Sequence, residues 1–335
     1  MTQHVSWPEI ENFHNLRRSL EKYPNLLGDD KKVTYRAKVK VHGTNAGVRI
    51  DPDGTVTALS RSAVITPRAD NLGFAKWVSE HEQSFSRLAR NFTIVVFGEW
   101  CGPGIQKGVA VCGIPKKSFA VFGARIPEIN GIATDPTYLS ALVEGLQDTR
   151  VLPWYEGGKT YTVDWLTSGD ALQATLDVIN DDVHAVERED PWVSRTWGVK
   201  GVGEGLVFYP QGRGDSYKIF GDLVFKAKGE KHNTVAKTRP AQKEATTVEG
   251  LADFVDLVVT EARLEQGSSH VMLHGSGVPF DVRDMGEFLR WIHADLVKET
   301  AAELAASKLE PKEAYKACTN QARAWYMNQS RKLQG

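Results

Sequence analysis

Hydrophobic and polar positions alternate with a period of two through much of the first two thirds of the chain. This pattern predicts strands over 33–41, 46–50 and 55–59, with a hairpin turn at 51–54. Apolar runs predict further strands, which cover 92–97, 117–126, 204–210 and 219–228. Helical spacing predicts helices between them, which cover 74–88, 135–146 and 168–180. Strands are therefore expected to form the framework of this part of the chain.

The pattern changes after residue 228. Residues 229–245 are polar and basic, which is typical of a linker. A capping box at 246–249 precedes a helix that is expected to stop near Gly267. Asp281 is suited to cap a long helix with one apolar face, and Pro311 suits the first turn of a last helix that runs to about residue 333. The final third is therefore expected to be helical.

Composition supports a globular protein of two domains. The chain has 335 residues, of which 25% are charged and 41% are hydrophobic, so disordered and collagen-like classes are excluded. The predicted fold class is α+β, with antiparallel sheets and flanking helices, followed by a small all-α domain. We place the first domain at 1–230, the linker at 231–245 and the helical domain at 246–335.

Charge and cysteine content bear on the surroundings of the protein. The formal net charge is −1, so contact with nucleic acid has to come from local basic patches. Three cysteines are too few for a disulfide framework, which fits a reducing cytosol. The sequence shows neither a signal-peptide pattern at its start nor an apolar run long enough to span a membrane. We therefore expect a cytoplasmic protein without membrane contact.

The first candidate for chemistry is Lys40, in the segment Lys-Val-His-Gly-Thr-Asn. A strand is predicted to end at this lysine and a turn with Gly43 follows at once. A lysine fixed in such a place becomes a nucleophile if burial or nearby cations lower its pKa. The alternative interpretation is a solvated lysine in front of an ordinary turn.

Two carboxylates and a pair of lysines extend the candidate site. Glu99 follows an apolar strand and Glu204 opens one, and a charge in such a position is costly without a partner or ligand. Lys226 and Lys228 are two residues apart and share one face of a strand, where a polyanion such as a triphosphate would relieve their repulsion. Capped strand ends and an exposed edge strand are the alternatives. Together these residues supply what nucleotidyl transfer through a covalent lysine adduct needs.

These segments resemble the motifs of the covalent nucleotidyltransferases, which include DNA ligases, RNA ligases and mRNA capping enzymes. The strings KVHGTN, FGEWCGPGIQKGV, EGLVF and FKAK are most similar to the bacteriophage T4 RNA ligase 2 family. The matching segments cover about residues 40–230. The resemblance implies an ATP-grasp-like ligase domain followed by a small helical domain.

The resemblance also implies a role for each matching residue. Lys40 would carry AMP as a phosphoramidate, Lys226 and Lys228 would contact the α-phosphate, and Glu204 would organise a metal ion through water. The resemblance also implies that Val39, Lys40 and Val41 contact the nucleotide. Asn45 would lie near the nucleotide and the RNA end, and Arg61 would contact ribose or phosphate. Glu99 would bind the ribose, and Phe119 would stack on adenine. Position 39 departs from the family, because valine stands where many members have an acid.

The expected activity is ATP-dependent joining of RNA 3'-OH and 5'-phosphate ends, with Mg²⁺ as the metal, at nicks in duplex RNA, as in RNA repair. No protein partner is implied, and we expect a monomer. The alternatives are a polynucleotide ligase for DNA or RNA–DNA hybrids, a capping guanylyltransferase, and a non-catalytic RNA-binding protein that keeps the ligase fold.

Overall fold

The structure is a computed structural model that describes residues 4–28, 31–213, 216–229, 251–259, 261–278, 280–300, 304 and 309–334. The chain divides into two compact units, Met1–Thr238 and Arg239–Gly335. The predicted linker at 231–245 and the capping box at 246–249 lie outside the described residues, so both stay predictions.

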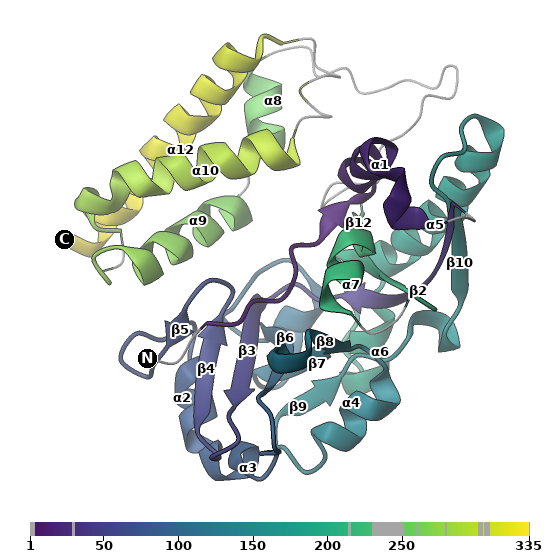
Figure 1. The fold of residues 1–335 in the computed structure, drawn as a ribbon. Coiled ribbons are helices and arrows are strands. Elements are labelled where there is room, and N and C mark those ends of the chain that lie inside the picture. Colours follow the sequence, from purple (N-terminus) through teal and green to yellow (C-terminus); the bar gives the residue numbers. More distant parts are fainter. Residues whose placement is uncertain are drawn as a thin grey trace. The chain divides into compact units, whose positions relative to one another are not determined.

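Unit 1 is built on two sheets. The first, sheet A, has five strands, which in spatial order are β1 (Glu11–Asn12), β12 (Phe225–Lys228), β11 (Gly205–Pro210), β2 (Lys32–Lys40) and β10 (Thr160–Asp164). All neighbouring pairs are antiparallel except β1 with β12. The predicted strands that carry Lys40 and Lys226 are therefore both in sheet A, one on each side of β11. Figure 1 labels these two strands as β2 and β12.

Sheet B has seven strands. Six follow the spatial order β5 (Val64–Ile65), β4 (Val56–Ser60), β3 (Thr44–Ile50), β6 (Ile94–Cys101), β7 (Ser118–Ile126) and β8 (Gly131–Ala133), all antiparallel. The seventh, β9 (Thr149–Val151), pairs in parallel with β7. A β-bulge interrupts the pairing of β6 with β7 after Phe97. The mixed α+β architecture with antiparallel sheets agrees with the predicted fold class.

Seven helices pack around the two sheets in the described part of unit 1. They are α1 (Phe13–Lys22), α2 (Phe74–Glu80), α3 (Glu82–Ser86), α4 (Pro136–Leu142), α5 (Asp170–Arg188), α6 (Pro191–Trp197) and α7 (Tyr217–Leu223), with short 3-10 turns at Pro24–Leu27, Ala110–Gly113, Pro127–Ile129 and Tyr155–Gly157. Helices α1 and α5 pack on sheet A, and α2 packs on sheet B. Under α1 and α5, Phe208 stacks on Phe225 with ring centres 4.5 Å apart, and Trp165 donates to the Tyr35 hydroxyl at 3.0 Å. This buried layer holds β11 and β12 rigidly beside β2.

The predicted strand over 219–228 is wrong in its first half. Residues Tyr217–Leu223 form helix α7, and only Phe225–Lys228 are a strand. Phe220 and Leu223 are both buried at a spacing of three, and Lys218 pairs with Asp222 one turn on at 2.9 Å. The apolar residues satisfy the helical period here, although a strand period fits them equally well in the sequence alone.

Several other predicted elements also differ in their limits. The helix predicted over 74–88 is broken at His81, whose φ of −112° separates α2 from α3. The predicted stop at Gly267 is wrong, because α9 (Glu261–His274) continues through it. A Cβ atom at Gly267 would lie 2.9 Å from side-chain atoms of Trp291 and Ile292. This glycine therefore permits close helix packing instead of ending the helix.

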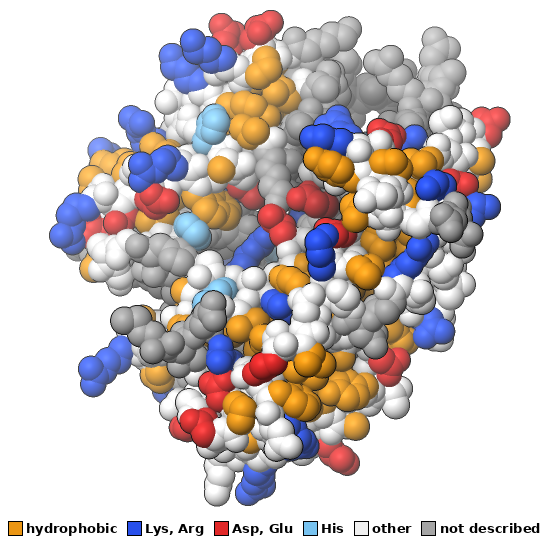
Figure 2. All heavy atoms as spheres, viewed as in Figure 1, with side chains coloured by type: hydrophobic (Ala, Val, Ile, Leu, Met, Phe, Trp, Pro, Cys, Tyr) orange, Lys and Arg blue, Asp and Glu red, His pale blue; other side chains and the backbone are white. Residues whose placement is uncertain are grey.

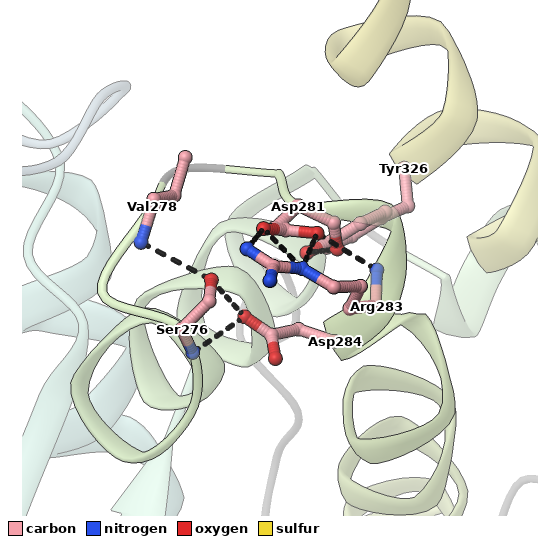
Figure 3. Close-up of polar contacts among 6 residues, drawn as sticks. All are labelled: Ser276, Val278, Asp281, Arg283, Asp284 and Tyr326. Carbon is pink, nitrogen blue, oxygen red and sulfur yellow. Dashed lines mark hydrogen bonds and ion pairs between the residues drawn. The ribbon is translucent and has the colours of Figure 1, made fainter.

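Unit 2 is entirely helical in the part that the structure describes. Its helices are α8 (Leu251–Val258), α9, a 3-10 turn at Val282–Asp284, α10 (Met285–Glu299) and α12 (Pro311–Gln334). The predicted apolar face of α10 is confirmed, since Phe288, Ile292 and Leu296 are fully buried. The predicted cap Asp281 accepts from the backbone of Arg283 and so starts the 3-10 turn in front of α10. Figure 3 shows the surrounding polar contacts, in which Tyr326 of α12 donates to the Asp281 carbonyl at 3.1 Å.

The surface carries both signs of charge. On the face shown in Figure 2, Lys and Arg side chains are interspersed with Asp and Glu, which agrees with the net charge of −1. Among the described residues, no helix has the length and apolar character that crossing a bilayer requires.

Candidate active site

The register of sheet A places four lysines on one face. Lys40 of β2 and Lys228 of β12 both pair with Gly205, which lies between them on β11. In the next row, Lys38 and Lys226 both pair with Val207. Residues directly opposite each other in a sheet project to the same side. The predicted lysine pair on β12 therefore faces a second lysine pair on β2.

Gly205 keeps the space between Lys40 and Lys228 free of a side chain. Its φ is +146°, and a Cβ atom there would lie 2.2 Å from the carbonyl oxygen of Ala227. Both the backbone conformation and the packing therefore require glycine. A strip of bare backbone with an ammonium group on each side is suited to a phosphate group.

Glu204, immediately before β11, is the counter-charge of this face. It is only 3% exposed, and Lys40 Nζ lies 2.7 Å from its Oε2 atom. Lys228 Nζ lies 3.3 Å from its Oε1 atom, and His42 Nδ1 lies 3.3 Å from Oε2. Burial opposes ionisation, but the Lys40 and Lys228 ammonium groups and His42 outweigh it and hold the pKa of Glu204 well below 4.5. Glu204 is therefore an ionised carboxylate that fixes Lys40 in place.

Sheet B contributes the second predicted carboxylate. Glu99 lies inside β6 and not after the strand, because the strand continues to Cys101. Its Oε1 atom accepts a hydrogen bond from the backbone of Gly43 at 3.2 Å. Burial raises the pKa of Glu99 to about 7, with Lys40 opposing and Glu204 reinforcing the shift. The pKa of Glu99 is thus raised and the pKa of Glu204 is lowered, although both carboxylates lie near Lys40.

The turn after Lys40 is tightly packed. A Cβ atom on Gly43 would lie 2.4 Å from the carbonyl oxygen of Trp100 and 2.9 Å from the side chain of Glu99. Gln106 donates to the Gly43 carbonyl at 3.2 Å, and Asn71 donates to the Thr44 hydroxyl at 2.9 Å. The turn therefore joins the end of β2 to sheet B and brings Glu99 up to the lysine face.

Asn45 and Arg61, two further predicted nucleotide contacts, lie in different surroundings. Asn45 pairs with Glu99 across β3 and β6, so it is on the same face of sheet B. Arg61 is 74% exposed and lies 3.5 Å from Glu9. In the described part of the chain, it is not among the groups that contact Glu99 or Glu204.

The position of Phe119 does not fit the stacking role that the resemblance implies. Phe119 pairs with Trp100, so it is on the opposite face of sheet B from Glu99. It is fully buried under α2, with its ring 5.2 Å from Phe74 and 5.8 Å from Trp77. The alternation of a strand gives adjacent residues opposite faces, and Phe119 is on the wrong one.

Phe122, which the sequence analysis did not select, lies at the bulge of β7, where the pairing with β6 skips it. The residue belongs to the β-bulge and packs with Trp7 in the core between the sheets. Its carbonyl oxygen accepts a hydrogen bond from Lys38 Nζ at 3.0 Å. An aromatic residue three positions after Phe119 is visible in the sequence, but the bulge that decides its face is not.

Lys38 is the second residue that the sequence analysis missed. It is fully buried, and its Nζ atom lies 4.9 Å from the ring centre of Trp154 and 5.2 Å from that of Tyr209. Burial lowers the pKa of Lys38 to about 7. Lys38 therefore links sheet A to the bulge of sheet B beneath the site.

A pocket opens beside Val39. β10 pairs with β2 only as far as Arg36, so the outer edge of residues 37–40 has no strand partner within the described residues. The pocket walls include Val39, three aromatic side chains and two arginines, namely Trp154, Tyr155, Trp192, Arg150 and Arg195. A free strand edge next to aromatic walls is suited to a planar base. Val41, the residue that follows this segment, is 5% exposed.

The site offers one ionised carboxylate to a metal ion. Among the described residues, no group of three His, Cys, Asp or Glu side chains is arranged to hold one. Glu204, the ionised carboxylate beside Lys40, is the candidate for one oxygen ligand, which is the role that the resemblance implies for it. Mg²⁺ commonly combines one or two carboxylates with substrate phosphates and water, and this site fits that mode.

Comparison with known proteins places part of this chain in a family. The family described as RNA ligase matches residues 33–228, which contain every site residue discussed above except Trp7 and Glu9. Solved structures of an RNA ligase from Naegleria gruberi are also similar. A mutant of it with ATP and Mn aligns at 18% identity with a TM-score of 0.44, and the same ligase with PPi aligns at 18% identity with a TM-score of 0.45. Each alignment covers 68% of this chain and 57% of the Naegleria chain, so the match spans little more than half of that protein. The family match covers more than half of this chain, so the chain belongs to the RNA ligase family.

Proposed function

We propose that this chain is an ATP-dependent RNA ligase, of the kind found in bacteriophage T4 RNA ligase 2, that joins 3'-OH and 5'-phosphate ends in nicked duplex RNA. One observation carries the proposal. Lys40 Nζ lies 2.7 Å from the buried Glu204, in a row with Gly205 and Lys228, on a face with four lysines. An amine in that position has cations on either side of the place where a phosphate would lie.

In the first step, Lys40 Nζ attacks the α-phosphorus of ATP. A nitrogen–phosphorus bond forms, the bond from the α-phosphorus to the bridging oxygen breaks, and pyrophosphate leaves. Lys226 and Lys228 offset the charge that develops on the phosphoryl oxygens. The base is expected in the pocket beside Val39.

Lys40 has to lose a proton before it attacks. In the free protein, the ion pair with Glu204 favours the ammonium form of Lys40, because the low pKa of Glu204 makes that carboxylate a poor base. Binding of ATP therefore has to weaken this ion pair. A divalent cation such as Mg²⁺, held by Glu204 through water and by phosphate oxygens, would offset negative charge in the site.

The second and third steps use RNA. An oxygen of the RNA 5'-phosphate attacks the adenylyl phosphorus, the bond to Lys40 breaks, and the RNA end becomes adenylylated. The neighbouring 3'-OH then attacks the 5'-phosphate, AMP leaves, and a phosphodiester forms.

The test is transfer of label from α-labelled ATP to the protein. With Mg²⁺ present, the wild-type protein is expected to take up label with release of pyrophosphate, and the label should be stable to base and released by acid, as a phosphoramidate is. Lys40→Ala should take up none, whereas Lys76→Ala, which removes a lysine that is 71% exposed, should label like wild type. A wild-type protein that stays unlabelled after removal of bound AMP would show that the site only binds.

A panel of nicked duplexes separates the polynucleotide alternatives. Sealing of nicks with RNA on both sides is the expected result. Sealing restricted to all-DNA nicks would identify a DNA ligase instead, and labelling by GTP in place of ATP would identify a capping enzyme.

A further inference from the structure

Of the four lysines on the inner face of sheet A, Lys38 is the one to which the proposed reaction gives no role. Lys38 is fully buried, whereas the side chains of Lys40 and Lys228 are 23% and 25% exposed. The Lys38 amine is therefore covered by other groups of the protein. Any effect that it has on a bound nucleotide has to pass through those groups.

Three groups cover the Lys38 amine. Its Nζ atom donates to the Phe122 carbonyl at 3.0 Å and lies over the rings of Trp154 and Tyr209, 4.9 Å and 5.2 Å from their centres. The two rings meet edge to face, with their centres 5.7 Å apart. In the described part of the chain, no carboxylate lies within ion-pair distance of Lys38. A charged amine is therefore stabilised here by one carbonyl and two ring faces.

Trp154 is shared between this cluster and the pocket beside Val39. Its side chain is one of the pocket walls, and Arg36 also lies over the ring, at 5.9 Å from the ring centre. Trp154 belongs to no helix or strand, because it lies between β9 and the 3-10 turn Tyr155–Gly157. The position of the Trp154 ring therefore depends on its side-chain contacts and not on the hydrogen bonds of a sheet.

Lys38 connects that ring to the rigid part of the fold. Lys38 is held in β2, and its hydrogen bond to Phe122 fixes the amine at the bulge of β7. A cation over a tryptophan ring is worth most where water is excluded, as it is at this fully buried amine. The fixed amine therefore holds the Trp154 ring in one place against the pocket.

We propose that Lys38 is a positioning residue for nucleotide binding, which holds the Trp154 ring as a wall of the base pocket and so supports recognition of the base and not of the phosphates. This inference rests on the proposed function, since it concerns the base of the same ATP. A direct effect of the Lys38 charge on the phosphates of ATP is the rival that the test has to separate.

The experiment compares two variants of the full-length chain, Lys38→Met and the control Lys76→Met. Methionine fills the space of the lysine stem but has neither a charge nor an N–H donor. The control removes a lysine of α2 that is 71% exposed and pairs with Glu80 on its own helix. Thermal unfolding checks that both variants fold.

Isothermal titration calorimetry in EDTA would measure the binding of two probes, ATP and tripolyphosphate, of which the second has phosphates but no base. A pH of 6.5 keeps most of Lys38 charged, because its pKa is about 7. Lys38→Met is expected to bind ATP on the order of tenfold more weakly and to bind tripolyphosphate like wild type. The control should match wild type for both probes. Unchanged binding of ATP to Lys38→Met, or an equal loss for both probes, would overturn the proposal.

Trp154→Ala shows whether the effect passes through the ring. This variant should bind ATP more weakly than wild type, and the addition of Lys38→Met should weaken binding no further, because the two side chains act as a unit. If the second substitution causes a further tenfold loss, Lys38 does not act through Trp154 and the proposal is wrong.

Self-adenylylation separates this result from the proposed function. Lys38→Met should take up label with a raised KM for ATP and an unchanged rate at saturating ATP, since Lys40, Glu204 and Lys228 are kept. If wild type takes up label and Lys38→Met binds ATP like wild type, the Lys38 proposal alone fails. If wild type binds ATP but takes up no label, the ligase activity fails and the calorimetry still decides the role of Lys38. A wild type that binds no ATP would overturn both.

Discussion

The two carboxylates beside Lys40 should respond to pH in opposite ways, and Glu99→Gln tests this most clearly. Burial raises the pKa of Glu99 from 4.5 to about 7 in the folded protein. Between these values the folded protein keeps a proton that the unfolded chain has lost. The free energy of unfolding of wild type should therefore fall as pH rises from 4.5 to 7.

The size of the effect follows from the shift in pKa. A difference of about 2.5 between 4.5 and about 7 corresponds to about 3 kcal/mol. Glutamine keeps the acceptor for the Gly43 backbone but carries no proton that titrates. Relative to wild type, the free energy of unfolding of Glu99→Gln should rise by about 3 kcal/mol between pH 4.5 and 7 and should not rise further above about pH 8.

Glu204→Gln is the matched comparison. The pKa of Glu204 is lowered, so its contribution to stability is complete above pH 4.5 and is lost only as the pH falls through the folded value. The difference in free energy of unfolding between Glu204→Gln and wild type should therefore be constant from pH 5 to 8 and should shrink below pH 4.5. Urea unfolding at several pH values measures both variants. A Glu99→Gln difference that does not change between pH 4.5 and 7 would refute the assignment of Glu99 as a desolvated acid.

Three further predictions concern the same site. Relative to wild type, the free energy of unfolding of Lys38→Met should be highest below pH 7 and should fall by about 3 kcal/mol by pH 9, because the pKa of Lys38 is lowered to about 7. Unfolding at pH 6 and pH 9 measures this difference between variant and wild type. The same difference at both pH values would contradict the prediction. Gly205→Ala should abolish labelling by ATP and lower the unfolding midpoint, since its Cβ would lie 2.2 Å from the Ala227 carbonyl; retention of both would show that β11 adapts. EDTA should stop labelling and leave the unfolding midpoint unchanged, because no three-residue metal group exists among the described residues; a fall in the midpoint would reveal a structural metal.

The sequence predicted the chemical groups of the site better than their surroundings. A lysine held before a turn indicates Lys40, a charge at a strand end indicates Glu204, and a lysine pair on one strand face indicates Lys228. The structure brings Glu204 into contact with both lysines. Strand alternation also predicted that Lys226 and Lys228 share a face. These inferences depend only on local periodicity, which the sequence displays directly.

The missed residues depend on contacts between distant segments. Lys38 belongs to a run of basic residues that looks like a solvated surface, and only the pairing of β2 with β11 and the cover of Trp154 bury it. Phe119 and Phe122 differ in face because of a bulge in the pairing of β6 with β7. Neither the bulge nor the burial leaves a local signal in the sequence, since both arise from tertiary packing.

The most direct test of the central claim is peptide mapping by mass spectrometry of the protein after incubation with ATP and Mg²⁺. Four lysines share the face that we assign to the nucleotide, so the site of modification discriminates between them. We expect a single 5'-adenylyl group on Lys40. The same group on Lys38, Lys226 or Lys228, with Lys40 unmodified, would contradict it.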